Sequence, residues 1–312
     1  MNRWKEMKKI LVVGSLNMDL VTKVDVTPTV GETVSGTGLE LIPGGKGANQ
    51  AIAMSKLGAN VKMVGLIGDD QYGDLLRSNL ELEGVDHSEV RMVSQCPSGI
   101  AFIMVNRSGD NSIVVVPGAN EKLLPTDIQE SWFEDVEYLV CQLETPLDTI
   151  EEVLKEAKAK HIKTILNPAP AKQLTKDLLR HVDMLVPNET EFYHITGIKI
   201  TSKEDFIEGY RMINQLGIKE LIVTMGAQGS WYYNGTDFIE AKAEKVNAID
   251  TTAAGDSFIG GVVTKLASGY SMSEALDYGS KVAAITVTRF GAQSSLPTCE
   301  EVEALEVKNE KR

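Results

Sequence analysis

The sequence predicts an α/β fold in which helices cover both faces of a mostly parallel sheet. Two observations predict it: short apolar runs recur along the 312 residues, and helical periods separate several of them. Strand–helix alternation favours a parallel sheet, because each helix carries the chain back to the same edge. Ligands bind such sheets at the carboxyl ends of the strands, so polar residues that follow the strands are candidates for a functional site.

The expected strands of the main sheet are short runs rich in Val, Ile and Leu, which are typical of strands buried on both faces. They span residues 8–14, 62–68, 137–143, 163–169, 183–188 and 220–226, with a further short strand at 231–233. Helices are expected where apolar residues recur with helical spacing. These are Ile150, Val153, Leu154 and Ala157 in one segment and Ile259, Val262, Val263 and Leu266 in another. Thr126 and Gln129 have capping-box spacing, which predicts the start of a third helix.

Two segments interrupt the alternation and predict a small antiparallel β-sheet lid. It would be built from residues of about 20–43 and 97–118 and inserted in a single domain over residues 1–312. The first segment has no helical period, and the second contains a hairpin with the turn NRSGDN. One face of this small sheet is expected to be apolar. That face would cover a ligand cleft or a second subunit, unless it packs against its own domain. The residues expected on it are Ile100, Phe102, Met104, Ile113 and Val115.

Composition narrows the class of protein. The formal net charge of −13, from 31 basic and 44 acidic residues, argues against a nucleic-acid or anionic-membrane partner. Cys96, Cys141 and Cys299 lie far apart, and the four histidines form no ligand pair, so neither a disulfide framework nor a zinc site is expected. The first apolar run, ILVVG, is too short for a signal peptide or a membrane span, so we expect a cytoplasmic protein.

Two common nucleotide-binding motifs are missing from the sequence. A P-loop needs a glycine five residues before Gly-Lys, but Glu40 precedes Gly45-Lys46 at that distance and Gly47 follows it. A glycine-rich dinucleotide motif should follow the first strand, which instead runs into GSLNMD at 14–19. Any nucleotide must therefore be bound in another way.

Two polar segments could line a ligand site, the first with groups that suit a polyol and the second with a polar, positive wall. In GSLNMD, Asn17 and Asp19 end the first strand and point the same way, as polyol-binding groups would; an Asx turn is the alternative. In PGGKGANQA, Lys46 and Asn49 stand at the start of a helix behind glycines that let a ligand approach the backbone. A plain glycine turn is the alternative for this second segment.

Three segments are more ambiguous. Glu144 in QLETP follows a strand, either as a ligand or as a solvated acid before a helix that Pro146 starts. Asn188 and Glu191 in PNETE fit a helix cap, although the carboxylate could also reach Mg²⁺ through water. Thr224 and the glycines of TMGAQG could bind phosphate or simply form a turn.

DTTAAGDSF at 250–258 leads into the helix that contains Ile259. The first amides of that helix, from about Ala253 to Asp256, lack intrahelical partners, and small side chains leave them open to an anion. The helix dipole favours the ionised form of Asp256, which could accept a proton while the amides stabilise a transferring phosphoryl group. The alternative is an acidic first turn behind a glycine-rich bend.

Taken together, the order and spacing of GSLNMD, PGGKGANQA, QLETP, NPAPA, PNETE, TMGAQG, DTTAAGDSF and GAQSS resemble the ribokinase branch of the PfkB-type carbohydrate kinases. The resemblance covers residues of about 9–298. It implies a Rossmann-like three-layer αβα core with a β-sheet lid that is often shared across a homodimer. It also implies ATP-dependent phosphorylation of D-ribose at O5, with Mg²⁺ and activation by a monovalent cation such as K⁺.

The resemblance assigns roles to individual residues. Asp256 would be the catalytic base, and the backbone of Ala253, Ala254 and Gly255 would form the anion hole. The sugar would be held by Asn17, Met18, Asp19, Gly45, Lys46, Gly47, Ala48, Asn49 and Glu144. ATP would be held by Asn188, Thr224, Met225, Gly226, Ala227, Gln228, Gly229, Gly255, Asp256 and Ser280. The K⁺ site would use Asp250, Thr252, Thr286, Arg289, Gly291 and Ser295, and Glu191 would act on Mg²⁺ through water.

The assignment leaves rivals open. A related kinase for deoxyribose or a nucleoside would share these motifs, and Asn17 discriminates if it binds the ribose 2-hydroxyl. A non-catalytic sugar or nucleotide sensor on the same fold is a second rival. Ser280 departs from the family pattern, which often has Asn or His there.

Overall fold

The computed structural model describes residues 8–309 of the chain. Within these residues a nine-stranded main sheet has the order β13-β12-β11-β10-β9-β8-β1-β4-β5, and the run from β11 to β5 is parallel. Its strands are β1 (Lys9–Val13), β4 (Val61–Gly68), β5 (Asp86–Val93), β8 (Val136–Cys141), β9 (Lys163–Leu166), β10 (Met184–Leu185), β11 (Glu220–Thr224), β12 (Ser230–Tyr233) and β13 (Phe238–Ala241). All seven predicted strands are confirmed, and the two edge strands, β5 and β13, are additional.

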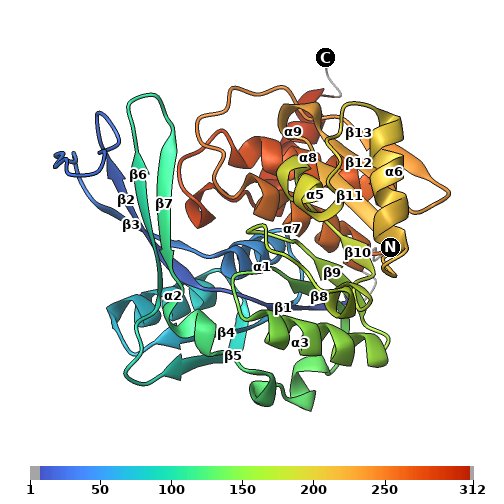
Figure 1. Cartoon of the computed structure of the whole chain (residues 1–312), viewed down its shortest axis with the longest axis horizontal. Helices are drawn as coiled ribbons and strands as arrows, with labels where there is room; N and C mark the ends of the chain where they lie inside the picture. The colour runs from blue at the N-terminus through green and yellow to red at the C-terminus, as the bar shows by residue number, and fades with distance from the viewer. Residues whose placement is uncertain (1–7, 310–312) are drawn as a thin grey trace.

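Helices lie on both faces of the main sheet (Figure 1). They are α1 (Lys46–Lys56), α2 (Gln71–Leu82), α3 (Leu147–Ala159), α4 (Lys176–Leu179), α5 (Glu189–Thr196), α6 (Lys203–Asn214), α7 (Ala254–Ala267), α8 (Met272–Thr286) and α9 (Cys299–Asn309). The predicted helices around Ile150 and Ile259 are confirmed as α3 and α7. Within residues 8–309 no helix combines the length and apolar character that crossing a membrane requires.

Alternate side chains of β1 pack into two separate hydrophobic cores, because successive side chains of a strand point to opposite faces of the sheet. Ile10 and Val12 belong to a core that includes residues of α1, α7 and α8. Leu11 and Val13 belong to a second core that includes residues of α3, α5 and α6. The predicted three-layer αβα architecture is therefore confirmed, with the sheet between two helical layers.

The predicted helix at Thr126–Gln129 is wrong. This segment forms two short 3₁₀ turns, at Pro125–Asp127 and Glu130–Phe133. Asp127, not Gln129, closes the cap, because its carboxylate accepts a hydrogen bond from the backbone N–H of Leu124 at 2.8 Å. Pro125 fits the first position of a turn but adds nothing that would extend it into an α-helix.

The lid sheet projects away from the main sheet (Figure 1). It contains β2 (Asn17–Lys23), β3 (Glu40–Gly44), β6 (Gly99–Val105) and β7 (Asn111–Val116) in the order β3-β2-β6-β7. The outer pairs are antiparallel as predicted, whereas β2 and β6 run parallel. Asn17 and Asp19 thus lie in the first strand of the lid sheet rather than at the end of β1.

The predicted apolar face of the lid sheet was misassigned in part. Phe102 pairs with Val114, and Ile103 pairs with Ile113. Because directly paired residues share a face, Ile113 and Val115 lie on the face opposite Phe102. Both faces expose large apolar side chains, since Phe102 is 47% exposed and Val115 48%.

Candidate active site

The start of α7 lines a cavity. Ala253 precedes the helix in the left-handed region, with φ 58°, and its carbonyl accepts a hydrogen bond from the Ser257 N–H at 2.8 Å. The N–H groups of Ala253, Gly255 and Asp256 have no hydrogen-bond partner within residues 8–309, whereas that of Ala254 donates to the Thr251 carbonyl at 3.2 Å. A Cβ on Gly255 would meet no atom within 4 Å, so the helix start can accept an anion.

Asp256 is buried in the first turn of α7, with 6% of its surface exposed. Its Oδ2 accepts a hydrogen bond from Asn49 Nδ2 at 3.0 Å, and its Oδ1 accepts one from Gln50 Nε2 at 2.9 Å. Helices α1 and α7 approach closely because Gly260 of α7 lacks a side chain: a Cβ there would lie 2.6 Å from the Cβ of Ala53 in α1. One turn before this contact, the same packing brings Asn49 to Asp256.

Lys46 opens α1 beside several carboxylates. Gly45 precedes it at φ 89°, and a Cβ on Gly45 would lie 2.7 Å from the backbone nitrogen of Asn17, so only glycine fits. Burial disfavours the charged form of Lys46, but the carboxylates of Asp256 and Glu144 outweigh it, and the pKa of Lys46 is raised. The ammonium group is therefore a fixed positive charge in the site.

Asn17, Asp19 and Glu144 lie together where the lid sheet joins the core. Glu144 Oε2 accepts hydrogen bonds from the Ser15 hydroxyl, from Lys46 N at 3.0 Å and from Asn17 Nδ2 at 3.5 Å. Burial raises the pKa of Asp19 to about 7, and the Glu144 charge adds to the effect while Lys46 opposes it. The cluster offers carboxylate acceptors and amide donors to a polyhydroxylated ligand.

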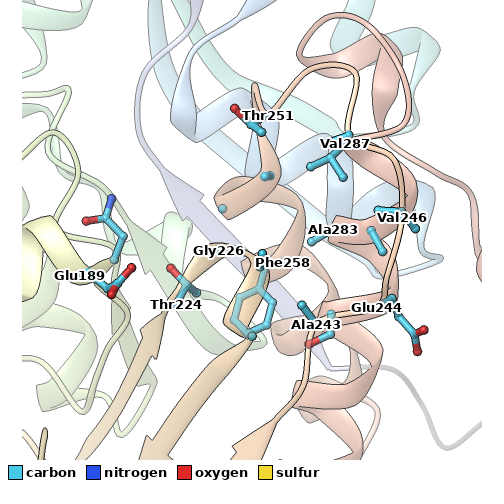
Figure 2. A pocket seen from close by; sticks show the side chains of 18 of the residues that line it. Glu189, Thr224, Gly226, Ala243, Glu244, Val246, Thr251, Phe258, Ala283 and Val287 are labelled. Atoms are coloured by element: carbon cyan, nitrogen blue, oxygen red, sulfur yellow. The ribbon is translucent and has the colours of Figure 1, made fainter. Parts of the chain in front are cut away.

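Two adjoining cavities meet at the start of α7. The smaller, about 190 Å³, is lined by polar groups that include Lys46, Asn167, Glu191 and Asp256. The larger, about 510 Å³, is lined by largely apolar groups from the loop after β13 and from α7 and α8, among them Val246, Phe258, Ala283 and Val287. In Figure 2, Phe258 stands between Thr224 on one side and Ala283 and Val287 on the other. Asn188, Thr224, Thr251, Ala254 and Gly255 line both cavities.

A family model described as pfkB family carbohydrate kinase matches residues 7–299. The chain belongs to this family. A ribokinase from Haemophilus influenzae is 40% identical over 94% of this chain and 97% of its own length, and a deoxyribokinase from Salmonella typhi is 36% identical over 94% and 96%. The structure of Arabidopsis thaliana ribokinase complexed with ribose and ATP matches with a TM-score of 0.90 at 31% identity, over 96% of this chain and 98% of that one.

In this pfkB-family chain, Asn188 and Glu191 form a capping box at the start of α5. Glu191 Oε2 accepts a hydrogen bond from Asn188 N at 2.9 Å, and Asn188 Oδ1 accepts one from Glu191 N at 2.8 Å. Burial raises the pKa of Glu191, against the hydrogen bond from Asn188. The cap is structural, yet both residues also line the smaller cavity, so the two interpretations of PNETE are compatible.

The predicted cation-site residues are brought together in part. Asp250 Oδ2 accepts a hydrogen bond from Gly291 N at 3.0 Å, and Oδ1 accepts two from Thr252. The Thr286 carbonyl accepts a hydrogen bond from Arg289 N at 3.1 Å. Asp250 therefore joins the loop before α7 to the segment after α8. Ser295 is fully buried, and its hydroxyl donates to the carbonyl of Ala292 at 2.7 Å.

Some of the other predicted site residues line a cavity, and others do not. Thr224, Gly226, Ala227, Gly229 and Ser280 line the larger cavity. The side chains of Met18 and Ala48 belong to the hydrophobic core, and Met225 belongs to the second core. Gln228 lines neither of the two cavities, and Gly47 serves mainly to let α1 approach Gly14 and Ser15, since a Cβ there would lie 2.6 Å from Ser15 N.

Sequence reasoning missed two groups of residues. The first is a pair of fully buried amides: Gln50 donates a hydrogen bond to Asp256, and Gln142 donates one to Gln50. Both lie close in the sequence to predicted residues, Gln50 next to Asn49 and Gln142 two residues before Glu144. The apolar lining of the larger cavity was also missed, because the loop at 242–253 has no periodicity and its residues become a wall only when it packs beside α7 and α8. These lining residues are Ala243, Val246, Ala248, Phe258, Ala283, Ala284 and Val287.

Proposed function

We propose that this chain is an ATP-dependent ribokinase that transfers the γ-phosphoryl group of ATP to O5 of D-ribose. The observation that carries the proposal is the position of Asp256: it is buried, held by two amide donors, and faces the cavity into which the free N–H groups at the start of α7 also open. The names of the relatives support the sugar, since the Haemophilus protein is a ribokinase and the Arabidopsis structure contains ribose and ATP.

ATP would occupy both cavities, with its base in the larger one. The apolar walls from Val246, Phe258, Ala283 and Val287 suit a planar aromatic base, and a cavity of about 510 Å³ is in the usual range for such ligands. The phosphates would pass Asn188 and the Thr224–Gly229 turn toward the smaller cavity. There the N–H groups of Ala253 and Gly255 would meet the transferring phosphoryl group.

Ribose would lie between the lid sheet and α1. Asp19 and Glu144 would accept hydrogen bonds from its hydroxyls, while Asn17, Lys46 and Asn49 would donate. Gly44 and Gly45 let the backbone approach this cluster, since a Cβ on Gly44 would lie 2.4 Å from Asp19 Oδ2.

The reaction would be an in-line displacement. The O5 oxygen forms a bond to the γ-phosphorus while the bond from that phosphorus to the β–γ bridging oxygen breaks, which releases ADP. The O5–H proton passes to Asp256. The helix-start amides and Lys46 stabilise the negative charge of the transferring group, so catalysis rests on positioning and electrostatics.

Mg²⁺ would be held mainly by the ATP phosphates. Within residues 8–309, no group of three His, Cys, Asp or Glu side chains is arranged to hold a metal ion. This fits Mg²⁺ in kinases, which keeps several waters and takes few protein ligands. Glu191, at the wall of the smaller cavity, would orient those waters, and the ion would supply neutralisation of phosphate charge.

A monovalent cation such as K⁺ would bind beside Asp250. Backbone carbonyls suit this ion, and the carbonyls of Thr252, Thr286, Arg289 and Gly291, with Ser295, are the proposed ligands. Asp250 fits the role because its Oδ2 accepts one hydrogen bond, from Gly291 N, and keeps a second lone pair, whereas Oδ1 already accepts two from Thr252. When bound, the cation would supply positive charge close to the anion-binding start of α7.

The lid sheet would cover the sugar and also join two copies of the chain. Asp19, Ala101 and Val115 are in register and share a face, which would close over the sugar. The opposite face, with Phe102, Val114 and Leu41 exposed, needs another occupant, and we assign it to a homodimer partner. The use of ATP favours a cytoplasmic location.

The second candidate is a deoxyribokinase, because a protein of that name is 36% identical to this chain. An ATP-consumption assay with a panel of pentoses and nucleosides tests both. We expect kcat/KM for ribose to exceed that for 2-deoxyribose by about 100-fold or more, because Asn17 would lose its hydroxyl partner. Equal kcat/KM values for ribose and 2-deoxyribose would contradict the ribose assignment. No ATP consumption with any sugar would favour a non-catalytic sensor.

Replacement of Asp256 tests the proposed base. Asp256→Ala removes the proton acceptor but leaves both cavities, so we expect kcat to fall by at least about 10³-fold while ATP affinity changes little. Calorimetric titration with ATP and a coupled ADP assay measure the two quantities. Turnover close to that of the unmodified chain would remove Asp256 from the mechanism.

A further inference from the structure

The two amides that hold Asp256 have different surroundings. Asn49 is 6% exposed and shares the Gln293 amide with the backbone of Gly44, whereas Gln50 is fully buried; Gln50 lines neither cavity. Gln50 therefore does not touch the substrates in the proposed reaction. It nevertheless donates to Asp256 Oδ1 at 2.9 Å, much as Asn49 donates to Oδ2 at 3.0 Å.

Gln50 is itself held by a second amide. Its Oε1 accepts a hydrogen bond from Gln142 Nε2 at 2.6 Å, and its Nε2 also donates to Asn167 Oδ1 at 3.2 Å. A carboxylate only accepts hydrogen bonds, so the NH₂ group of Gln50 must face Asp256. Its carbonyl then faces Gln142, which must turn its own NH₂ group inward. Asp256 thus fixes the direction of the whole chain of amides.

The orientation of the Gln142 amide leaves one buried atom without a hydrogen bond. Gln142 Oε1 is buried and has no hydrogen-bond partner in the described part of the chain. It packs on the backbone of Gly14, where a Cβ would lie 2.2 Å away. Rotating the amide to release this oxygen would set the carbonyl of Gln142 against that of Gln50. The unpaired oxygen is accounted for if Gln142 serves to orient Gln50.

Asn49 is oriented from behind in the same way. Its Oδ1 accepts a hydrogen bond from Gln293 Nε2 at 3.1 Å, and Gln293 Oε1 accepts one from Asn79 Nδ2 at 2.6 Å. Each oxygen of Asp256 is therefore the end of a chain of amides. Such a carboxylate cannot rotate about its Cβ–Cγ bond without breaking both hydrogen bonds.

We propose that Gln50, backed by Gln142, is a positioning residue for phosphoryl transfer. It fixes the rotation of the Asp256 carboxylate, so that the remaining lone pairs face the sugar hydroxyl before ATP and the sugar bind. The inference rests on the proposed function, in which Asp256 is the base. Preorganisation of this kind acts on the chemical step and leaves substrate binding unchanged.

The first test is Gln50→Met, which keeps the volume of the side chain but removes the donor to Asp256. We expect kcat to fall roughly 10- to 100-fold, with the KM for ribose and the Kd for ATP within about two-fold of their original values. Asp256→Ala is measured beside it. Loss of turnover in Asp256→Ala with unchanged kcat in Gln50→Met would overturn the positioning role alone, whereas turnover in Asp256→Ala would overturn the base and the positioning role together.

The second test uses Gln142→Met, which removes the unpaired oxygen together with the donor to Gln50. Stability toward thermal unfolding should stay unchanged, yet kcat should fall by about 3- to 10-fold. Because Gln142 acts only through Gln50, the double variant should have the kcat of Gln50→Met. Multiplicative losses in the double variant, or loss of stability without loss of kcat in Gln142→Met, would show a merely structural role and overturn the proposal.

Discussion

At the scale of a single residue, the buried carboxyl group of Asp19 makes the stability of the chain depend on pH. Its pKa rises from 3.8 to about 7, chiefly because of burial. The folded chain holds this proton more tightly than the unfolded chain, so ionising Asp19 lowers stability as the pH rises from 3.8 through about 7. Asp19→Asn should therefore raise the free energy of unfolding at about pH 8, on the order of 4 kcal/mol, and change it little at about pH 4.

Chemical denaturation at the two pH values, without sugar, measures this difference. Asp70 provides a matched control of opposite sign. Burial works against its charge, but hydrogen bonds from Ser98 and Gly73 lower its pKa, so Asp70→Asn should lose stability at about pH 8. If Asp19→Asn loses stability at that pH as Asp70→Asn does, the burial argument for Asp19 is wrong. The KM for ribose should rise in Asp19→Asn, because a carboxylate acceptor is lost.

At the scale of helices and strands, sequence patterns predicted elements better than the contacts between them. The parallel strands were recognisable because both of their faces are buried. Strand β5 (Asp86–Val93) was missed because, as an edge strand, it mixes charged and apolar residues. Gln50 was missed for another reason: it lies about 100° around α1 from Asn49, and only the crossing with α7 brings both to Asp256.

The crossing of α1 and α7 itself can be tested at Gly260. A Cβ there would lie 2.6 Å from the Cβ of Ala53, so Gly260→Ala should force the helices apart and cost about 1–3 kcal/mol of stability. Asp256 lies one turn before Gly260 and Asn49 one turn before Ala53, so kcat should fall as well. Adding Ala53→Gly should restore part of both. Thermal unfolding and steady-state kinetics measure these effects, and an unaffected Gly260→Ala would contradict the close packing.

At the scale of the whole molecule, the lid sheet has two exposed apolar faces with different proposed partners. The hairpin was predictable from its turn, but its register was not, because β-branched residues fill four consecutive positions from Ile113 to Val116. Only the pairing of Phe102 with Val114 shows which residues share a face. With the faces assigned in this way, each of the two proposed roles, covering the sugar and joining two copies of the chain, belongs to a different face of the lid sheet.

A charge on either face of the lid sheet distinguishes the two roles. Phe102→Asp places a carboxylate on the face proposed for the partner copy, and should convert a dimer into a monomer in light scattering after size-exclusion chromatography. Val115→Asp places the same charge on the face that carries Asp19, and should leave the dimer intact while raising the KM for ribose about 10-fold or more. Dissociation by Val115→Asp with no effect of Phe102→Asp would reverse the two faces. A chain that is monomeric without substitution would leave the Phe102 face to a different partner.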